Sequence, residues 1–186
     1  MTSLLSISRK VEKLIRKYRT SDPRELCDAL DIHVSVRDLG SVIKAYYFCQ
    51  SRIGYIALNS RVSESMRRIF IAHELGHDRL HKKLAILRGF QEVEFFDIAR
   101  PTEYEANLFA AELLISDKEL LGMLNYDEKS FFDVAQEFDV PAPLLDFKLR
   151  ILKNKGYHFE PLYIANGDFL KDSTDGCFDE VDFVRA

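Results

Sequence analysis

The chain has 186 residues, of which 47% are hydrophobic and 12% aromatic, so it can bury one sizeable core and is not a disordered chain. The chain has 26 Lys and Arg residues and 30 Asp and Glu residues. Its net charge of -4 excludes the broad basic field that binding of a nucleic-acid backbone requires. Three cysteines, none of them in a C-x-x-C pair, favour reduced thiols in the cytosol over a disulfide scaffold.

The N-terminal segment and the apolar runs of the chain give no membrane or secretion signal. Residues 1–18 contain charged side chains at positions 9, 10, 12 and 13, which interrupt the apolar core of a signal peptide and favour an amphipathic helix. No apolar run approaches the roughly 18 residues that span a bilayer. We therefore expect a cytoplasmic protein that does not bind membranes.

The first third of the chain predicts two short helices followed by a small sheet. Apolar residues at helical spacing, and then an Asp22-Pro23 start signal, predict the helices. β-branched and aromatic residues gather in residues 33–37, 43–48 and 55–59, and turn residues separate these segments. We expect a small antiparallel sheet from them.

Apolar residues then recur at three- and four-residue steps over about residues 63–81, which predicts a helix with one buried face. His73 and His77 occupy that face. Gly76 lies in the helix interior, where glycine costs about 1 kcal/mol relative to alanine. We expect a neighbouring element or a ligand to approach the helix closely at this glycine.

A second buried helix is predicted from Thr102 to about Ile115. Thr102 and Glu105 match a T-x-x-E capping box, in which the glutamate side chain bonds back to the helix N-terminus, and the run that follows is strongly apolar. The capping box therefore gives Glu105 a structural role that competes with any role in a site.

The C-terminal part predicts two further helices within residues 130–155, and these resemble a helix-turn-helix unit. Since only four cations lie near it, we expect this segment to pack or to dock a partner and not to read DNA. An Asn-Gly pair within residues 162–170 predicts a hairpin, and residues 172–186 are expected to form an acidic, solvated tail. The expected organisation is one domain over residues 1–171 followed by that dispensable tail.

His73-Glu74-Leu75-Gly76-His77 has the pattern H-E-x-x-H. On a helix the four-residue step places both imidazoles on one face, about 6 Å apart along the axis, so one ion can accept both. Zinc binds imidazole nitrogen at roughly 2.0 to 2.1 Å, and a catalytic site keeps a position for water. Glu74 can then take a proton from the attacking water and pass it to the leaving amine. We predict a zinc-dependent peptidase.

The third ligand is less clear from these residues. His81 continues the four-residue series, but it lies about 12 Å from His73 along the axis, too far to share an ion, and is expected to support or pack beside the site. Glu103, Glu105 and Glu112 of the second predicted helix remain as candidates.

Two segments of the chain resemble the ImmA/IrrE family of metallopeptidases. The run from His73 to His81 is similar to that family's H-E-L-G-H-x-x-L-H, and the run from Glu105 to Leu114 is similar to its E-A-N-x-F-A-A-x-L-L. The resemblance covers roughly residues 20–155. It implies a zincin-like α+β fold in which a small antiparallel sheet packs against a bundle that contains the active-site helix.

The resemblance also implies roles for residues of the second helix. The family's glutamate before Ala-Asn is the third zinc ligand, which corresponds to Glu105, with Glu103 as the alternative. Asn107 is implied to support a ligand or to pack between helices.

Family members of this kind cleave helix-turn-helix repressors of mobile elements, prophages or stress regulons. The resemblance thus implies a site-specific endopeptidase with a protein substrate and no direct contact with nucleic acid. We expect the substrate backbone to lie along residues 55–59 as an exposed sheet edge. The alternative is a non-catalytic antirepressor with a structural zinc, but structural zinc needs no general base such as Glu74.

Overall fold

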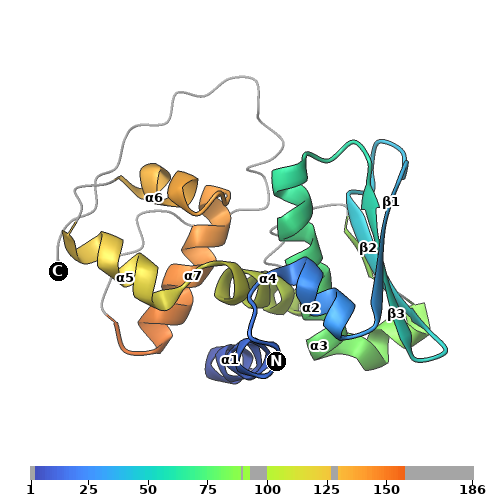
Figure 1. Ribbon diagram of the computed structural model, residues 1–186, viewed down its shortest axis with the longest axis horizontal. Helices are drawn as coiled ribbons and strands as arrows, with labels where there is room; N and C mark the ends of the chain where they lie inside the picture. Colours follow the sequence, from blue (N-terminus) through green and yellow to red (C-terminus); the bar gives the residue numbers. More distant parts are fainter. Residues whose placement is uncertain (1–2, 89, 93–99, 127–129, 158–186) are drawn as a thin grey trace.

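The computed structural model of the chain describes residues 3–88, 90–92, 100–126 and 130–157 (Figure 1). The elements in chain order are α1 (Leu4–Tyr18), α2 (Pro23–Ala29), β1 (Ile32–Arg37), β2 (Ala45–Gln50), β3 (Ile53–Asn59), α3 (Glu64–Arg88), β4 (Phe90–Glu92), α4 (Pro101–Leu114), α5 (Asp117–Tyr126), α6 (Phe131–Glu137) and α7 (Ala142–Asn154). The sheet lies on one side and α5 to α7 on the other, with α3 and α4 between them. The predicted α+β class is confirmed.

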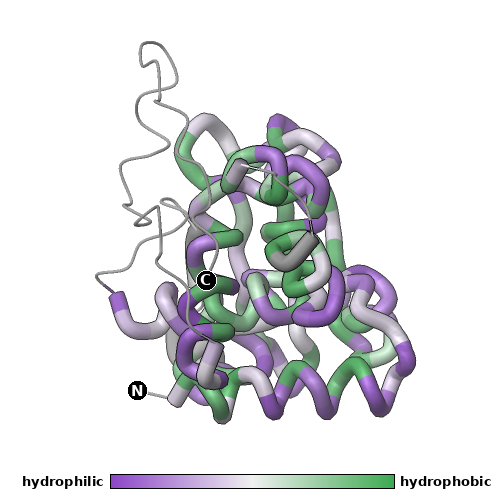
Figure 2. Tube along the Cα trace, turned by 90° about the vertical axis from the view of Figure 1, so that its left-hand side faces the viewer, coloured by the Kyte–Doolittle hydropathy of each residue, from purple (hydrophilic) through white to green (hydrophobic). Residues whose placement is uncertain are grey.

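The two N-terminal helices form as their sequence signals predict. Hydrophobic and hydrophilic residues alternate along α1 (Figure 2), and its buried side chains include Ile7 and Val11, on the face that packs against α4 and α7. At α2, the Asp22 side chain accepts hydrogen bonds from the backbone N–H groups of Arg24 and Glu25 at 2.8 and 2.9 Å, so Asp22 is the N-cap.

The sheet is mixed, so the predicted purely antiparallel arrangement was wrong. Within the described residues its order is β1-β3-β2-β4, and β2 is antiparallel to both of its neighbours. Ser51 and Arg52 both have positive φ, 51° and 70°, as a two-residue turn of type I′ requires, and they close the β2–β3 hairpin. β1 then joins the free edge of β3 and runs parallel to it. Strand patterning alone does not distinguish a parallel from an antiparallel neighbour.

The strand expected at the sheet edge is central. β3, which contains residues 55–59, lies between β1 and β2, and both of its sides are hydrogen-bonded. Its backbone is therefore not available to a substrate. The expectation that a substrate adds to this strand is wrong.

α3 packs against both the sheet and α4, and Gly76 lies where α3 and α4 approach each other closely. A Cβ atom there would lie 3.1 Å from Ala106 Cα, 3.2 Å from Ala106 O and 3.2 Å from Phe109 Cβ. Only a residue without a side chain allows the two helices to approach this closely. The predicted close approach is confirmed, and the approaching element is α4.

α4 begins earlier than its capping signal suggested. Pro101 is the first helical residue, Arg100 is the N-cap, and no side chain caps the helix. The predicted T-x-x-E capping box is therefore wrong, because Thr102 already lies inside the helix. Glu105 therefore does not cap the N-terminus of α4, as the capping box would have required.

The segment that resembles a helix-turn-helix unit forms α6 and α7, but α7 is a core helix. Ten of its residues are buried, including Lys148. Three of the four nearby cations are paired with carboxylates: Lys148 with Glu112, Arg150 with Asp146, and Lys155 with Glu112. α7 thus lacks the exposed basic face of a DNA-recognition helix.

Some expectations concern residues outside the described ranges. The predicted hairpin at residues 162–170 and the acidic tail at residues 172–186 both fall there. For the helices that are described, none combines the length and the apolar character needed to cross a bilayer.

Candidate metal centre

α3 presents His73 and His77 side by side, as the H-E-x-x-H spacing predicts. The side chains are 0% and 1% exposed, and the ring centroids are 4.8 Å apart. The two Nε2 atoms lie 3.1 Å from each other and point to a common place. Glu74 follows His73 on the same turn of α3 and is completely buried.

α4 brings Glu103 to the same place. Its Oε2 atom lies 3.3 Å from His73 Nε2 and 3.2 Å from His77 Nε2. Ligand atoms bound tetrahedrally to zinc at roughly 2.0 to 2.1 Å lie about 3.3 Å from one another. The three separations of 3.1, 3.2 and 3.3 Å fit that requirement, so these side chains can hold a metal ion as they stand.

Glu105, the sequence-based choice for the third ligand, lies elsewhere. Its Oε2 atom is 3.1 Å from His81 Nε2, whereas Glu103 is the glutamate grouped with His73 and His77. Residues two positions apart in a helix are separated by about 200° around its axis, so Glu103 and Glu105 do not share a face. The geometry therefore favours Glu103, the alternative named from the sequence.

The electrostatics also suit a metal ion. Burial is the main cause that lowers the pKa of His77 to about 4, which keeps the ring neutral with a lone pair available. For Glu103, burial alone would raise the pKa, but hydrogen bonds with His73 and His77 outweigh it and hold the pKa well below its usual range. Two imidazoles and a carboxylate form a donor set that zinc prefers.

The Nδ1 atom of each of these two imidazoles contacts another side chain. His73 Nδ1 lies 2.9 Å from Asn107 Oδ1, and His77 Nδ1 lies 3.1 Å from His81 Nδ1. Asn107, on α4, thus contacts a candidate ligand, in agreement with the role implied by the family resemblance. His81 lies beside the cluster and not within it, at a point where α3 leaves helical geometry, with φ -125° and ψ 16°.

Sequence analysis missed one buried contact beside the cluster. Tyr47 of β2 donates a hydrogen bond of 2.5 Å from its hydroxyl to Asp78 Oδ1, and Asp78 follows His77 directly. Asp78 also pairs with Arg79, and with Lys82 at 3.3 Å. The contact fixes the turn of α3 that carries His77 to the sheet. An aspartate next to a histidine on an apolar helix face was the available signal.

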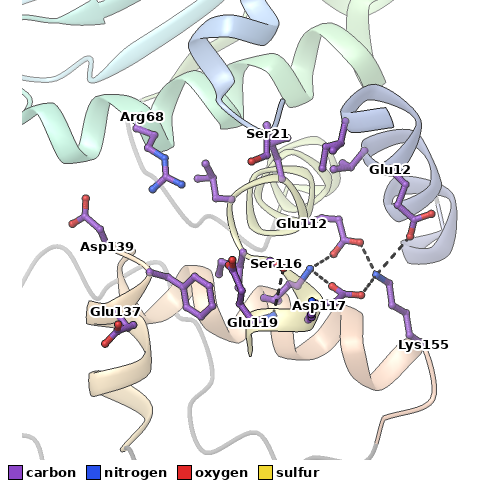
Figure 3. A pocket seen from close by; sticks show the side chains of 18 residues that line it. Glu12, Ser21, Arg68, Glu112, Ser116, Asp117, Glu119, Glu137, Asp139 and Lys155 are labelled. Carbon is purple, nitrogen blue, oxygen red and sulfur yellow. Dashed lines mark hydrogen bonds and ion pairs between the residues drawn. The ribbon is translucent and has the colours of Figure 1, made fainter. Parts of the chain in front are cut away.

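A separate polar pocket lies near the C-terminal end of α4. Its volume is about 810 Å³, and none of the residues that line it belongs to the histidine cluster. Lys155 lies between the carboxylates of Glu112 and Asp117, at 2.6 Å from each (Figure 3). Lys148 pairs with the same two carboxylates. The charged groups of these four side chains pair with one another, so the four do not form a candidate metal site.

The α+β fold and the buried cluster of two histidines and a glutamate define a protein of the zincin class. Residues 27–150, which include every residue of the cluster, match the peptidase family described as the IrrE N-terminal-like domain. The chain belongs to the ImmA/IrrE family of metallopeptidases.

Two relatives support this assignment. The chain is 36% identical over 149 residues to a protein of Bacillus phage phi105 named "Uncharacterized immunity region protein 2", covering 80% of this chain and 92% of the relative. It is 32% identical over 147 residues to the metallopeptidase ImmA of Bacillus subtilis strain 168, covering 77% of this chain and 83% of that protein.

Proposed function

We propose that this chain is a zinc-dependent, site-specific endopeptidase that cleaves a helix-turn-helix transcriptional repressor. The observation that supports the metal site is the set of three separations, 3.1 to 3.3 Å, between His73 Nε2, His77 Nε2 and Glu103 Oε2. The substrate class is supported by the family resemblance. The phage relative is named for an immunity region, and this agrees with a repressor from a prophage or a mobile element.

In this proposal His73, His77 and Glu103 hold the ion. Zinc, when bound, polarises the scissile carbonyl and lowers the pKa of water towards about 7. All three residues are buried, each 8% exposed or less, which limits the access of competing water to the ligand atoms.

Glu74 acts as the general base and then as the acid. Its carboxylate takes a proton from the attacking water as the water oxygen bonds to the peptide carbonyl carbon. It returns this proton to the amide nitrogen as the carbon–nitrogen bond breaks. The products are a new C-terminal carboxylate and a new N-terminal amine, so the step consumes one water and needs no other reactant.

The number of protein ligands favours an enzyme over an antirepressor with structural zinc. Structural zinc sites are almost always closed by four protein ligands, whereas catalytic sites have three. The cluster found among the described residues contains three. An ion held by these three residues alone would keep a position for water or substrate.

Replacement of Glu74 tests the proposal. Glu74→Gln keeps the size of the side chain but removes the base, so cleavage of the proposed helix-turn-helix repressor should fall about 10²- to 10⁴-fold. Zinc content and repressor binding should be retained. Glu64→Gln, the same substitution at an exposed position of α3, is the matched control and should cleave normally.

Fragments are followed on a gel, and association is measured separately. If the wild type binds the repressor and relieves repression without producing fragments, and Glu74→Gln does so equally well, the antirepressor alternative replaces the peptidase.

A further inference from the structure

A buried chain of polar contacts leads away from the candidate metal centre. His77 Nδ1 lies 3.1 Å from His81 Nδ1, and His81 Nε2 lies 3.1 Å from Glu105 Oε2. The three side chains are 1%, 8% and 4% exposed. Their contacts are therefore shielded from water, and the placement of each proton in them matters.

The protons in this chain can be assigned from simple rules. A neutral imidazole carries one N–H and one lone pair, and a carboxylate only accepts. When His77 Nε2 faces a cation, its proton lies on Nδ1 and is donated to His81 Nδ1. The proton of His81 then lies on Nε2 and is donated to Glu105. Every contact in the chain is satisfied in this arrangement.

Without a cation the same two protons do not satisfy every contact. If His77 Nε2–H donates to Glu103, two outcomes remain. Either the His77–His81 contact has no proton between its nitrogens, or the His81–Glu105 contact has none. With one proton on each of the two rings, the chain of contacts is complete only when a cation, and not a proton, faces His77 Nε2.

We propose that His81 and Glu105 are positioning residues that stabilise the form of His77 whose Nε2 lone pair faces the metal centre. The inference rests on the proposed metal site and extends it. It gives Glu105 a role in metal binding through His81, without direct contact between Glu105 and the ion. Asn107 serves His73 in the same way, through the 2.9 Å contact between His73 Nδ1 and Asn107 Oδ1.

Packing alone accounts poorly for this arrangement. A histidine that only fills space needs no partner at both nitrogens, and a buried carboxylate is costly unless it is hydrogen-bonded.

Zinc affinity of full-length variants tests the proposal. Affinity is measured by competition with a chromogenic chelator, and folding of each variant is checked by urea unfolding. His81→Phe and Glu105→Leu break the chain of contacts and should weaken zinc binding about 10- to 100-fold. His81→Asn and Glu105→Gln each keep an acceptor oxygen, so they should retain most of the wild-type zinc affinity. Glu112→Gln, the same substitution further along α4, is the control and should bind zinc normally.

A spectroscopic measurement separates positioning from packing. In the zinc-loaded protein, nitrogen NMR should show a coupling between His77 Nδ1 and His81 Nδ1 through the shared proton, with the proton on His77. The proton of His81 should lie on Nε2. His81→Phe necessarily loses the coupling, and Glu105→Leu should weaken it.

The outcomes distinguish the two proposals. If the wild type binds no zinc, the proposed function fails. If it binds zinc but folded His81→Phe and Glu105→Leu bind it equally well, the positioning role is overturned and the metal site stands. A proton found on His81 Nδ1 in the zinc-loaded protein would also overturn it.

Discussion

Two polar clusters, each at least partly buried, lie near the two ends of α4, and they are built in opposite ways. Near the C-terminal end, the carboxylates of Glu112 and Asp117 face the ammonium groups of Lys148 and Lys155. Two negative charges meet two permanent positive charges. The electrostatic attraction lowers the pKa of Asp117 and raises that of Lys155, against the opposing effect of burial.

Near the N-terminal end of α4, the groups facing the carboxylates are imidazoles. Glu103 contacts His73 and His77, and Glu105 contacts His81. Burial lowers the pKa of both His77 and His81, so these rings supply lone pairs in place of permanent positive charge. The charges of the lysine cluster, which consists of Glu112, Asp117, Lys148 and Lys155, therefore balance one another. The histidine cluster of His73, His77 and Glu103 instead presents a donor set for a cation.

The largest expected effect is on the stability of the metal-free protein. Lys148 is 1% exposed, so Lys148→Met leaves buried carboxylate charge with less compensation and should reduce the free energy of unfolding by about 3–5 kcal/mol. Glu103→Gln keeps a hydrogen-bonding group opposite the imidazoles but removes a carboxylate charge that the fold stabilises, so it should reduce the free energy of unfolding by a smaller amount, about 1–3 kcal/mol. Urea unfolding of both variants, with zinc removed, measures the difference. Equal losses would show that the two clusters are built alike.

Addition of zinc should affect the two clusters in the opposite order: substitutions in the histidine cluster should abolish the stability gained from zinc, and substitutions in the lysine cluster should not. At free zinc about 100-fold above its dissociation constant, binding to the native state alone should add about 2.7 kcal/mol to the stability of the wild type. Glu112→Gln should gain a similar increment, because Glu112 belongs to the lysine cluster. Glu103→Ala should gain almost none. Thermal unfolding with and without zinc provides the comparison, and a full gain in Glu103→Ala would place the ion elsewhere.

The smallest expected effects concern two helical glycines. Gly76→Ala would place a Cβ 3.1 to 3.2 Å from atoms of α4, and the overpacking cost of about 1–3 kcal/mol should exceed the helical gain of about 1 kcal/mol. Gly122 of α5 has open space where a Cβ would lie, so Gly122→Ala should stabilise by up to about 1 kcal/mol. Urea unfolding of the two variants should therefore give changes of opposite sign.

Periodicity and motif spacing were sufficient to predict the two helices of the site and the pairing of His73 with His77. The identity of the third carboxylate was not predictable in this way. It depends on the rotation of α4 about its own axis, which the contact between Gly76 and Ala106 constrains. The capping signal at Thr102 also misled, because α4 begins at Pro101 and the expected cap lies inside the helix.

The sequence pattern likewise did not predict that β1 runs parallel to β3. Apolar alternation indicates which face of a strand is buried, but pairing direction is decided by the route of the chain between strands. Here the hairpin of β2 and β3 leaves one side of β3 open, and β1 occupies it in parallel.

Zinc content of Glu103→Ala and Glu105→Ala, measured side by side with the wild type after dialysis against a weak chelator, tests the central claim most directly. We expect one zinc per wild-type chain and almost none in Glu103→Ala. Glu105→Ala should still take up zinc, with affinity weakened about 10- to 100-fold. Full zinc in Glu103→Ala together with its loss in Glu105→Ala would show that Glu105, and not Glu103, is the third ligand.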